Sequence, residues 1–508
     1  MENNGNGRLV LPPWWAVLSL VPFAALALHT DSRWFWSDNA AYLLLAKALA
    51  TGRGYADIYW PGAPPHSHFP PGMALFLAPV VAVFGASALP AGILMVATGI
   101  LTAMMSYSIA ARRLSKKEAL ALFYIFGTSP FYWMNCGDVS SDVSFSLISM
   151  IAIYFTDKAS RSGRVMSKDL IFAVFFLIAG YYFRTVGMAL IAGGAAYLLA
   201  TGPDPIRKRF YRALLAGSIS TAAAIPWMVY TSKISHDTYF SLLRVSEKGA
   251  TASYGEIAAR SLPRFAFYCS AFLEWSVHGV SVLHHRFPAI FWPATTIVVL
   301  FTIIGLFKSL IQRRSAGEYY VIFYMLLILP WFWYFDRFLM PVMIFLLIDF
   351  EVSAKDLVHR RLGTRGKLIF SRAALVFVAA LVAINAAGNV RYMKKRLAPD
   401  APRDDFYASS NWVRDHTPAD SIIFSRLSIP ASLNGDRVAD EDSLRNPPER
   451  AMELISPHHH AYLLTQGMDL DFEARRIQPL LIKYPNRFRE IYRAQGGTSA
   501  LYEVLPAP

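Results

Sequence analysis

Charge is scarce in this sequence. Only 17% of its 508 residues are Asp, Glu, Lys or Arg, and 55% are apolar, whereas soluble proteins carry about 25% charged residues. The apolar residues form long continuous runs, which excludes the alternating strands of a membrane β-barrel. Two cysteines, Cys136 and Cys269, exclude a disulfide framework and a thiolate metal site. Walker A, GxGxxG, HExxH and GxSxG patterns are also missing. We therefore predict a polytopic α-helical membrane protein.

The charges that do occur are unevenly distributed. Residues 1–391 carry 34 Lys and Arg against 19 Asp and Glu, whereas residues 392–508 carry 15 against 16. We expect a membrane domain with basic loops at 1–391 and a soluble domain at 392–508. In the second part, strand-like runs at 421–424, 461–465 and 500–505 and helix-like stretches at 406–415 and 472–482 predict a small α/β domain. The net charge of +14 thus reflects membrane loops and not nucleic-acid binding.

Eleven apolar runs are candidate membrane spans, because a span needs about 20 apolar residues. They lie near residues 11–29, 89–111, 118–135, 141–156, 170–183, 185–201, 211–231, 287–307, 319–335, 337–350 and 373–390. A twelfth run at 70–84 opens with Pro70 and Pro71 and contains Pro79. We expect this short run to be re-entrant or interfacial, which leaves a total of about 11–13 membrane helices.

Basic residues predict the orientation. If the N-terminus is cytoplasmic and the 70–84 run does not cross, five cytoplasmic loops hold 21 of the 34 Lys and Arg of residues 1–391. A basic cluster at 391–396 on the outer side disagrees. The outer side then has a first loop at about 30–88, a long loop at about 232–286 and the tail. We expect a multi-pass inner (plasma) membrane protein whose two cysteines face outward, and the sequence leaves open whether they are bonded to each other.

Acidic residues near the outer ends of spans are candidates for catalysis. In WFWSDNAAYLLLAKALATGRGY, Ser37 or Asp38 could cap a helix that runs to Ala50, or Asp38 could be a catalytic base. Asp138 and Asp142 are four residues apart and would share a face if their stretch is helical. The alternative for this pair is a solvated end of a span.

Basic residues and histidines are further candidates. Arg184 lies inside the 32-residue apolar stretch 170–201, which is too long for one span and must break there. It could bind a lipid phosphate or extend to ordinary headgroups. Asp336 and Arg337 could neutralise each other, or Arg337 could bind phosphate. His66 and His68, in PHSHFPPG, could bind a metal or carry protons, although their spacing is a weak signal.

The order of these motifs resembles the GT-C superfamily of integral-membrane glycosyltransferases. The likeness is to bacterial relatives of protein O-mannosyltransferases and lipid A aminoarabinose transferases, which are glycosyltransferase family 39-like enzymes. As in these relatives, the motifs follow one another in the order SDNAAYLLLAKALATGRGY, HFPPGMALFLAPVVAVFG, SSDVSF, FRTVGMALIAG, DRFLMPV and NWVRDHTPADSII. The resemblance implies a polyprenyl-phosphate sugar donor and a lipid, glycan or protein acceptor at the outer face of the bilayer, with transfer that inverts the anomeric centre.

The resemblance also implies roles for single residues. Asp38 and Asp142 take the positions of the family's acidic catalytic residues, although Asn39 stands where many relatives have a second acid. Arg184 and Arg337 take basic positions near the donor phosphate. His66, His68, Asp138 and Tyr42 are expected as further substrate or metal contacts. No cofactor is certain, and a divalent metal is left open.

Three other functions compete with this hypothesis. A transporter or lipid flippase would show pseudo-repeated halves and charges in mid-span, and the sequence has neither. A polysaccharide polymerase or ligase with a diphosphate-linked donor is a closer alternative, which the early acidic loop and the soluble tail disfavour. A sensor or assembly scaffold would not need Asp38 and Asp142.

Overall fold

The computed structural model describes residues 9–234, 244, 251–312, 315–361 and 363–506. Within it, the chain divides into two compact units. The first comprises residues up to 28, 67–73 and 94–394, and the second comprises 29–66, 74–93 and the chain from 395 onward. The expected first outer loop therefore belongs mostly to the same unit as the tail. Of the expected long loop at 232–286, residues 235–243 and 245–250 lie outside the described residues, as do Arg313 and Arg314 of one basic loop.

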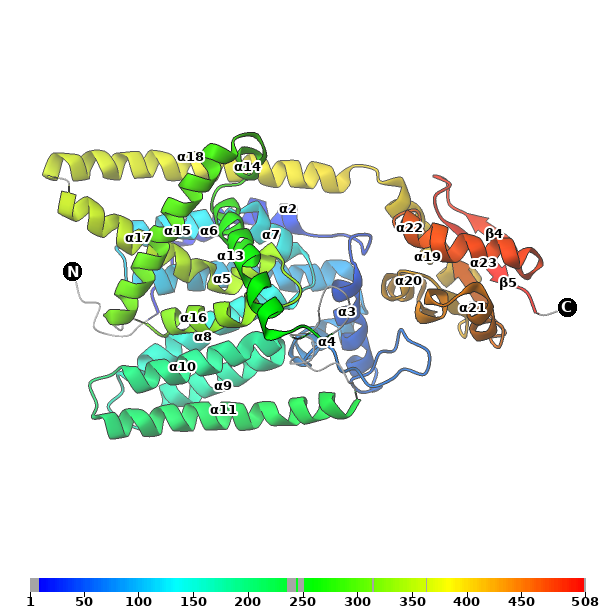
Figure 1. The fold of residues 1–508 in the computed structure, drawn as a ribbon, viewed down its shortest axis with the longest axis horizontal. Coiled ribbons are helices and arrows are strands. Elements are labelled where there is room, and N and C mark those ends of the chain that lie inside the picture. The colour runs from blue at the N-terminus through cyan, green and yellow to red at the C-terminus, as the bar shows by residue number, and fades with distance from the viewer. Residues whose placement is uncertain (1–8, 235–243, 245–250, 313–314, 362, 507–508) are drawn as a thin grey trace. The chain divides into compact units, whose positions relative to one another are not determined.

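The first unit is built from helices (Figure 1). They are α1 (Trp14–Leu18), α2 (Val21–Ala27), most of α5 (Ala88–Ala111), α6 (Lys116–Gly127), α7 (Pro130–Gly137), α8 (Ser141–Ser160), α9 (Lys168–Phe183), the 3-10 helix η1 (Thr185–Gly187), α10 (Met188–Ala200), α11 (Ile206–Ile234), α13 (Tyr254–Ser276), α14 (Ser281–Arg286), α15 (Pro288–Ile311), α16 (Ala316–Ile328), the 3-10 helix η2 (Asp336–Leu339), α17 (Met340–Arg361) and α18 (Thr364–Leu397). Each of the eleven runs predicted as spans overlaps at least one of these helices.

Several of these helices can cross a membrane. Within the described part of the chain, four are long and apolar enough, namely α5, α11, α15 and α18, and α7 with α8 forms a fifth candidate that is bent by 109°. The remaining apolar helices are shorter, so the number of spans stays a prediction. Helix α4 (Gly72–Phe84) covers the doubtful twelfth run, and Pro79 lies inside it. With 13 residues it is about 20 Å long, less than the roughly 30 Å of a bilayer core.

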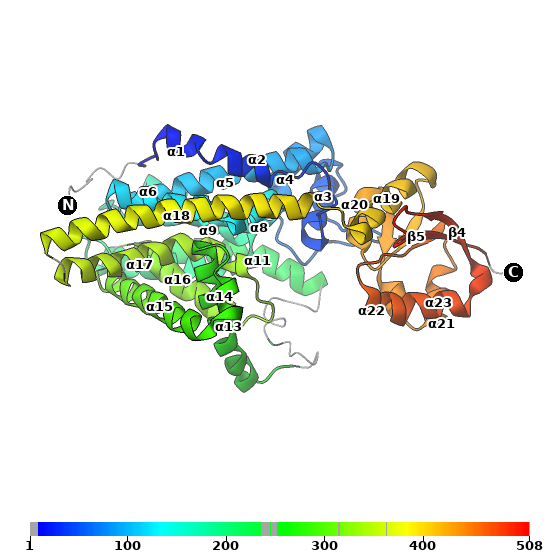
Figure 2. The same cartoon turned by 90° about the horizontal axis from the view of Figure 1, so that it is seen from above.

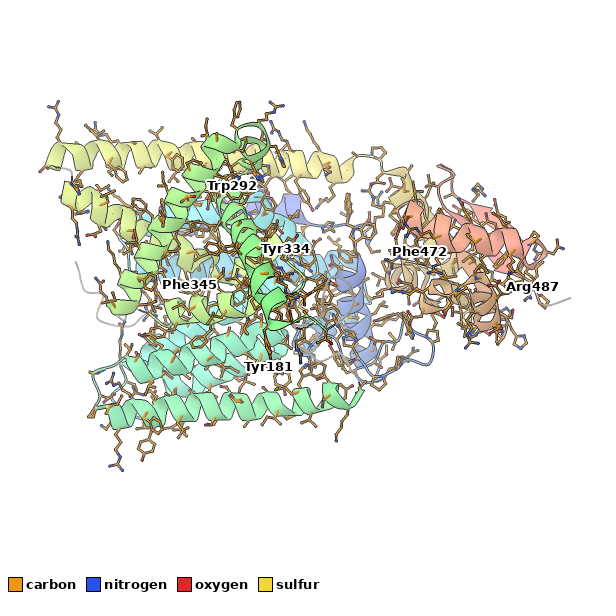
Figure 3. The ribbon with its side chains drawn as sticks, in the orientation of Figure 1. Tyr181, Trp292, Tyr334, Phe345, Phe472 and Arg487 are labelled. Carbon is orange, nitrogen blue, oxygen red and sulfur yellow. The ribbon has the colours of Figure 1, made fainter. Side chains whose placement is uncertain are left out.

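Small residues let the helices of the first unit pack closely, as is common in membranes. Helices α9, α10 and α11 lie side by side in Figure 1. A Cβ on Gly193 of α10 would lie 2.7 Å from the backbone nitrogen of Tyr320 in α16. A Cβ on Gly317 of α16 would meet the ring of Phe345 of α17, which Figure 3 labels. These close approaches fix α16 between α10 and α17.

A cluster of ion pairs joins four helices. Arg113, which follows α5, pairs with Glu318 of α16 and donates to Asp349 of α17 over 3.1 Å, and all three side chains are at most 6% exposed. Arg112 lies 3.8 Å from Asp157 of α8. These two arginines count toward the basic loops of the sequence analysis, yet they are held inside the protein by carboxylates.

The tail in the second unit forms a five-stranded sheet in the order β2-β1-β3-β5-β4. Its strands are β1 (Ile422–Phe424), β2 (Val438–Asp440), β3 (Ala461–Leu464), β4 (Phe488–Arg493) and β5 (Ala500–Val504). β1 is parallel to β2 and β3, whereas β5 is antiparallel to β3 and β4. The predicted α/β domain is confirmed. The three expected strands are present, and β2 and β4 were not foreseen.

Helices cover both faces of this sheet (Figure 2). Phe406 and Val413 of α19 (Ala401–His416) and Ala431 of α20 (Ser428–Gly435) pack against one face. Helices α21 (Pro448–Ile455) and α23 (Gln478–Lys483) pack against the other. Short elements complete the domain: η3 (Asp442–Arg445), α22 (Leu470–Phe472), the π-helical turn η4 (Glu473–Ile477) and η5 (Pro485–Arg487). Phe472 and Arg487 mark α22 and η5 in Figure 3.

The first loop packs directly on the tail within the second unit. Helix α3 (Ser37–Ala50) lies against α20, and Lys47 of α3 forms a 2.5 Å ion pair with Asp436 at the end of α20. The backbone nitrogen of Ala439 in β2 donates to the carbonyl oxygen of Tyr59 over 2.8 Å. The loop is therefore part of the tail's fold, which the sequence did not indicate.

Candidate functional site

Three interruptions of helices bring charged side chains together in the first unit. Asp142 lies in the first turn of α8, directly after the bend from α7. Arg184 lies between α9 and η1 in extended backbone, and Arg337 lies in η2 before α17. The break predicted at Arg184 is confirmed. Side chains at such breaks are positioned by the backbone of several helices at once.

Glycine makes the break at Arg184 tight. A Cβ on Gly187 would lie 2.6 Å from the backbone of Gly180 and of Tyr181, which Figure 3 labels near the end of α9. A Cβ on Gly72 would lie 2.5 Å from the carbonyl oxygen of Tyr182. Only a residue without a side chain fits at either position, so the backbone before and after Arg184 has little room to move.

Asp142 is the centre of the site. Its carboxylate is 1% exposed, and it accepts a 2.6 Å hydrogen bond from Nη1 of Arg184. The same nitrogen lies 3.1 Å from Oγ of Ser141. Nε of Arg337 lies 3.7 Å from the other carboxylate oxygen of Asp142. The buried carboxylate thus holds Arg184 by a charge-assisted hydrogen bond, which is directional and strong, and attracts Arg337 by its charge across 3.7 Å.

Aromatic rings surround the two arginines. The guanidinium of Arg184 lies 5.3 Å from the ring centre of Phe338, and that of Arg337 lies 5.1 Å from the ring centre of Phe335. Cations at these distances are attracted by the ring faces. Both guanidinium groups stay partly open, with side chains 21% and 25% exposed. They can therefore reach an anion that approaches from outside the helix bundle.

Two residues that the sequence analysis did not select anchor the η2 segment. The hydroxyl of Tyr324 in α16 donates to the carbonyl oxygen of Phe338 over 2.7 Å. Arg264 in α13 donates to the carbonyl oxygen of Phe332 over 2.7 Å and lies 5.5 Å from the ring centre of Tyr334, which is labelled in Figure 3. An arginine inside the long helix α13 is the signal that could have singled out Arg264.

Asp38 and Tyr42 lie in the second unit. Helix α3 runs from Ser37 to Ala50, which confirms the predicted end, but its N-cap is Trp36, whose side chain makes no capping hydrogen bond. The expectation that Ser37 or Asp38 caps the helix is wrong, because the helix begins one residue earlier and places Asp38 in its first turn. Tyr42 is buried at 5% exposure.

Asp138 and Asp142 do not share a helix face. Asp138 ends α7 in extended backbone, and α8 begins only at Ser141. The helical alternative for this stretch is therefore wrong, since the chain turns by 109° between the two helices. Asp138 remains half-buried beside the bend.

The two histidines have different surroundings. His66 is buried, and its Nδ1 lies 2.5 Å from a carboxylate oxygen of Asp57 within the first loop. His68 is exposed, contacts Phe69 edge-on, and belongs to the other compact unit. In the residues that the structure describes, no group of three or more His, Cys, Asp or Glu side chains could hold a metal ion. Cys136 and Cys269 are both free thiols.

The described residues thus combine a bundle of apolar helices, a partly open pair of arginines beside a buried carboxylate, and an α/β domain. Together they define an integral-membrane protein. The comparisons with known proteins agree. Residues 68–230 match the model of the family described as dolichyl-phosphate-mannose-protein mannosyltransferase. No curated protein matches the sequence. The chain has the GT-C fold, and the resemblance seen in its motifs is confirmed.

Three solved structures illustrate this likeness. ArnT from Cupriavidus metallidurans, bound to undecaprenyl phosphate, matches with a TM-score of 0.65 and 11% identity over 97% of this chain and 99% of its own. AglB from Archaeoglobus fulgidus is an archaeal oligosaccharyltransferase, solved in complex with an inhibitory peptide and a dolichol-phosphate. It matches with a TM-score of 0.53 and 11% identity over 96% of this chain and 74% of its own. Arabinofuranosyltransferase AftD from Mycobacteria matches with a TM-score of 0.50 and 13% identity over 99% of this chain and 40% of its own.

Proposed function

We propose that this protein is a membrane glycosyltransferase. It transfers a sugar from a polyprenyl-phosphate donor to an acceptor at the outer face of the membrane. The observation that carries the proposal is the convergence of Arg184 and Arg337 on buried Asp142 at three helix breaks. The family-model match, which includes Asp142 and Arg184, and the undecaprenyl phosphate bound to the similar ArnT support it.

In this proposal Arg184 and Arg337 bind the donor phosphate. Their partly exposed guanidinium groups can donate to phosphate oxygens while Asp142 fixes their orientation from the buried side. The bond between the anomeric carbon and the phosphate oxygen breaks, and the phosphate leaves with the electron pair. Positive charge beside the leaving oxygen stabilises the transition state. Asp142 acts through the arginines and is a positioning residue.

Asp38 is the proposed general base. A hydroxyl or amine of the acceptor loses its proton to the Asp38 carboxylate as its bond to the sugar forms. The phosphate is a good leaving group that needs no protonation, so one base suffices. Attack from the face opposite the phosphate inverts the anomeric centre. The N-cap position that the sequence left open for Asp38 is taken by Trp36, and Asp38 lies in the first turn of the helix.

We also propose the orientation given by the basic loops, with a cytoplasmic N-terminus and an extracytoplasmic tail from about 392. The short length of α4 supports the prediction that the 70–84 segment does not cross the membrane. A single cysteine introduced at position 87 should react with an impermeant maleimide in intact cells, in a chain whose own cysteines are replaced by alanine. Labelling of that position only after the cytoplasmic side is opened would reverse the orientation.

The enzymatic test uses the purified full-length protein in detergent. It is incubated with polyprenyl-monophosphate sugars and, separately, with polyprenyl-diphosphate glycans, with and without added Mg²⁺ or Mn²⁺, and loss of each lipid is followed by mass spectrometry. Consumption of a monophosphate sugar that requires Arg184 supports the proposal. Consumption of diphosphate glycans alone would instead favour the polymerase or ligase alternative.

A further inference from the structure

Two of the loops predicted to be cytoplasmic meet at one end of the helix bundle. The chain between α8 and α9 and the chain between α10 and α11 lie at the left-hand end of α9, α10 and α11 in Figure 1. Arg212 of α11 is fully buried and joins them. Its guanidinium donates to the backbone oxygens of Ser160 and Arg164 over 3.2 and 3.0 Å, and to Asp204 over 2.7 Å. A Cβ on Gly202 would lie 2.5 Å from the oxygen of Ser160, so the two loops are in close contact and form one surface.

We call residues 157–169 and 201–212 the basic surface, because they contain eight Lys and Arg and only three Asp. Each of these carboxylates already has a cationic partner, in the pairs of Arg112 with Asp157, Lys158 with Asp169, and Arg212 with Asp204. Within the described part of the chain, four exposed cations of the basic surface form no ion pair, namely Arg164, Lys168, Arg207 and Lys208. Unpaired cations that share a surface attract an anionic partner.

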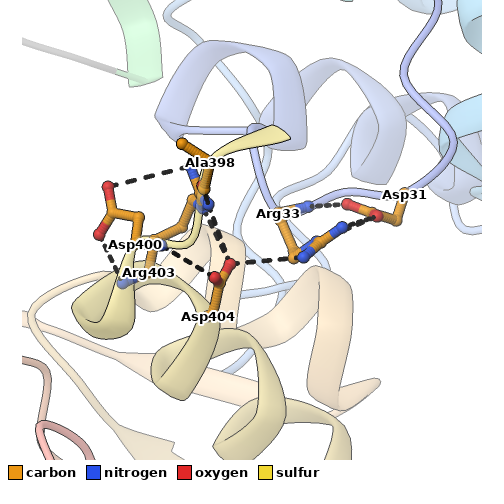
Figure 4. A network of polar contacts seen from close by, with 6 residues as sticks. All are labelled: Asp31, Arg33, Ala398, Asp400, Arg403 and Asp404. Carbon is orange, nitrogen blue, oxygen red and sulfur yellow. Dashed lines mark hydrogen bonds and ion pairs between the residues drawn. The ribbon is translucent and has the colours of Figure 1, made fainter. Parts of the chain in front are cut away.

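A cluster of arginines in the second unit shows the opposite balance of charge (Figure 4). Arg33 and Arg403 both pair with Asp404, over 3.4 and 3.0 Å. Asp31 lies 2.8 Å from Arg33, and Asp400 lies 3.8 Å from Arg403. Three carboxylates thus face two guanidinium groups, and this cluster has no surplus positive charge for an anion. Clustered basic residues alone therefore do not indicate a binding surface, and the unpaired cations distinguish the basic surface.

Apolar side chains lie directly beside these cations. Ile206 and Phe210 flank Arg207 and Lys208 at the start of α11, and they are 60% and 49% exposed. Met166, in the loop before α9, is exposed as well. Both α9 and α11 continue into apolar stretches that carry further exposed side chains. A phospholipid combines an anionic headgroup with apolar chains in the same way, whereas an acidic peptide or a nucleic acid would leave the apolar side chains in water.

We propose that the basic surface binds the headgroup of an anionic phospholipid, with Arg207 and Lys208 at the phosphate and the acyl chains along α9 and α11. Lys and Arg at the ends of membrane helices lie at the level of the headgroups, where anionic headgroups attract them. This site is separate from the proposed donor site. Lys168 begins α9 and Arg184 follows its last residue, so the 16 residues of the helix, about 24 Å, lie between them. The inference goes beyond the proposed transferase and does not depend on it.

Binding is tested on the purified full-length protein in detergent. Short-chain phosphatidylglycerol and phosphatidylcholine are titrated separately, and binding is followed by microscale thermophoresis at low and high salt. We expect tighter binding of phosphatidylglycerol, which weakens as salt is added. Arg207→Gln with Lys208→Gln should lower that affinity about tenfold or more, since both cations lie at the headgroup. The matched control is Arg475→Gln with Arg476→Gln, which removes two adjacent exposed cations from the tail and should leave the affinity unchanged.

A second variant and two soluble anions distinguish a lipid from other partners. Phe210→Ser should also weaken binding of phosphatidylglycerol, because the acyl chains lose an apolar contact. Equal affinity for the two lipids, or an unchanged affinity in the double variant of Arg207 and Lys208, would overturn the proposal. Inorganic phosphate or a polyglutamate peptide that binds through these two cations as tightly as phosphatidylglycerol would overturn it as well. The test uses no sugar donor, so its result is independent of whether the protein proves to be a transferase.

Discussion

Removing Arg184 should weaken binding of the donor phosphate and also leave a buried charge behind. Arg184 donates to Asp142 over 2.6 Å, and the remaining cation, Arg337, is 3.7 Å from that carboxylate. A hydrogen bond to a charged group contributes about 1.5–3 kcal/mol, so Arg184→Ala should lower the affinity for polyprenyl phosphate about ten- to a hundredfold. Breaking a buried ion pair costs about 3–5 kcal/mol of stability, so the variant should also melt at a lower temperature.

A double variant separates these two effects. In Arg184→Ala with Asp142→Asn, the uncompensated carboxylate is gone, so the melting temperature should recover in part while the affinity for undecaprenyl phosphate stays low. Both are measured on detergent-solubilised protein, by thermal unfolding and by titration calorimetry. Arg360→Ala is the control, because its side chain is 73% exposed. If affinity recovers together with stability, or never falls, Arg184 does not bind the phosphate.

Three further predictions concern single residues. Asp38→Asn should keep the fold and lower turnover about a hundredfold or more, and an active variant would remove Asp38 as the base. Gly187→Ala should weaken undecaprenyl phosphate binding in calorimetry, since a Cβ would lie 2.6 Å from backbone, whereas Gly363→Ala, with nothing within 4 Å, should not. Burial raises the pKa of Asp405, but hydrogen bonds from Thr498 and Gly496 outweigh it and lower that pKa. A lowered pKa means that the ionised Asp405 carboxylate stabilises the folded state. This contribution is present above the pKa of about 3.9 in the unfolded chain and is lost as pH falls through the lower pKa in the folded protein. Asp405→Asn should therefore reduce the resistance to urea unfolding at neutral pH and not at strongly acidic pH.

The membrane part of the fold was predictable because its signals are local. Apolar runs of 18 or more residues mark helices wherever they occur, so α5, α11 and α15 follow from the sequence. The break at Arg184 followed from the length of its apolar stretch. The bend before Asp142 did not, because Asp138 and Asp142 fit a helical spacing as well as a turn. Strand β1 is as short as β2 but consists of three large apolar residues, whereas β2 (Val438–Asp440) ends on a charged residue and forms no apolar run. Strand β4 was missed because it has exposed side chains on both faces.

Contacts between distant parts of the chain were not predictable. Basic residues next to a span predict a solvent-exposed loop. Arg113 is instead buried against Glu318 and Asp349, about 200 positions further along the sequence. Pairing of Asp142 with Arg337 is equally remote. Nothing in one sequence indicates which carboxylate meets which arginine, since every pair of opposite charges looks alike before the helices are packed.

The packing of the first loop on the tail indicates a structural role for the tail. A soluble domain after the last span could be an appendage that leaves the membrane chemistry untouched. Here Lys47 of α3 is paired with Asp436, and the carbonyl of Tyr59 accepts from the backbone of β2. Arg33, five residues before Asp38, is paired with Asp404 of α19. The helix that carries the proposed base thus packs against α20 of the tail, and ion pairs to the tail lie at its last turn and just before its first. The tail is therefore part of the scaffold that holds the helix of Asp38.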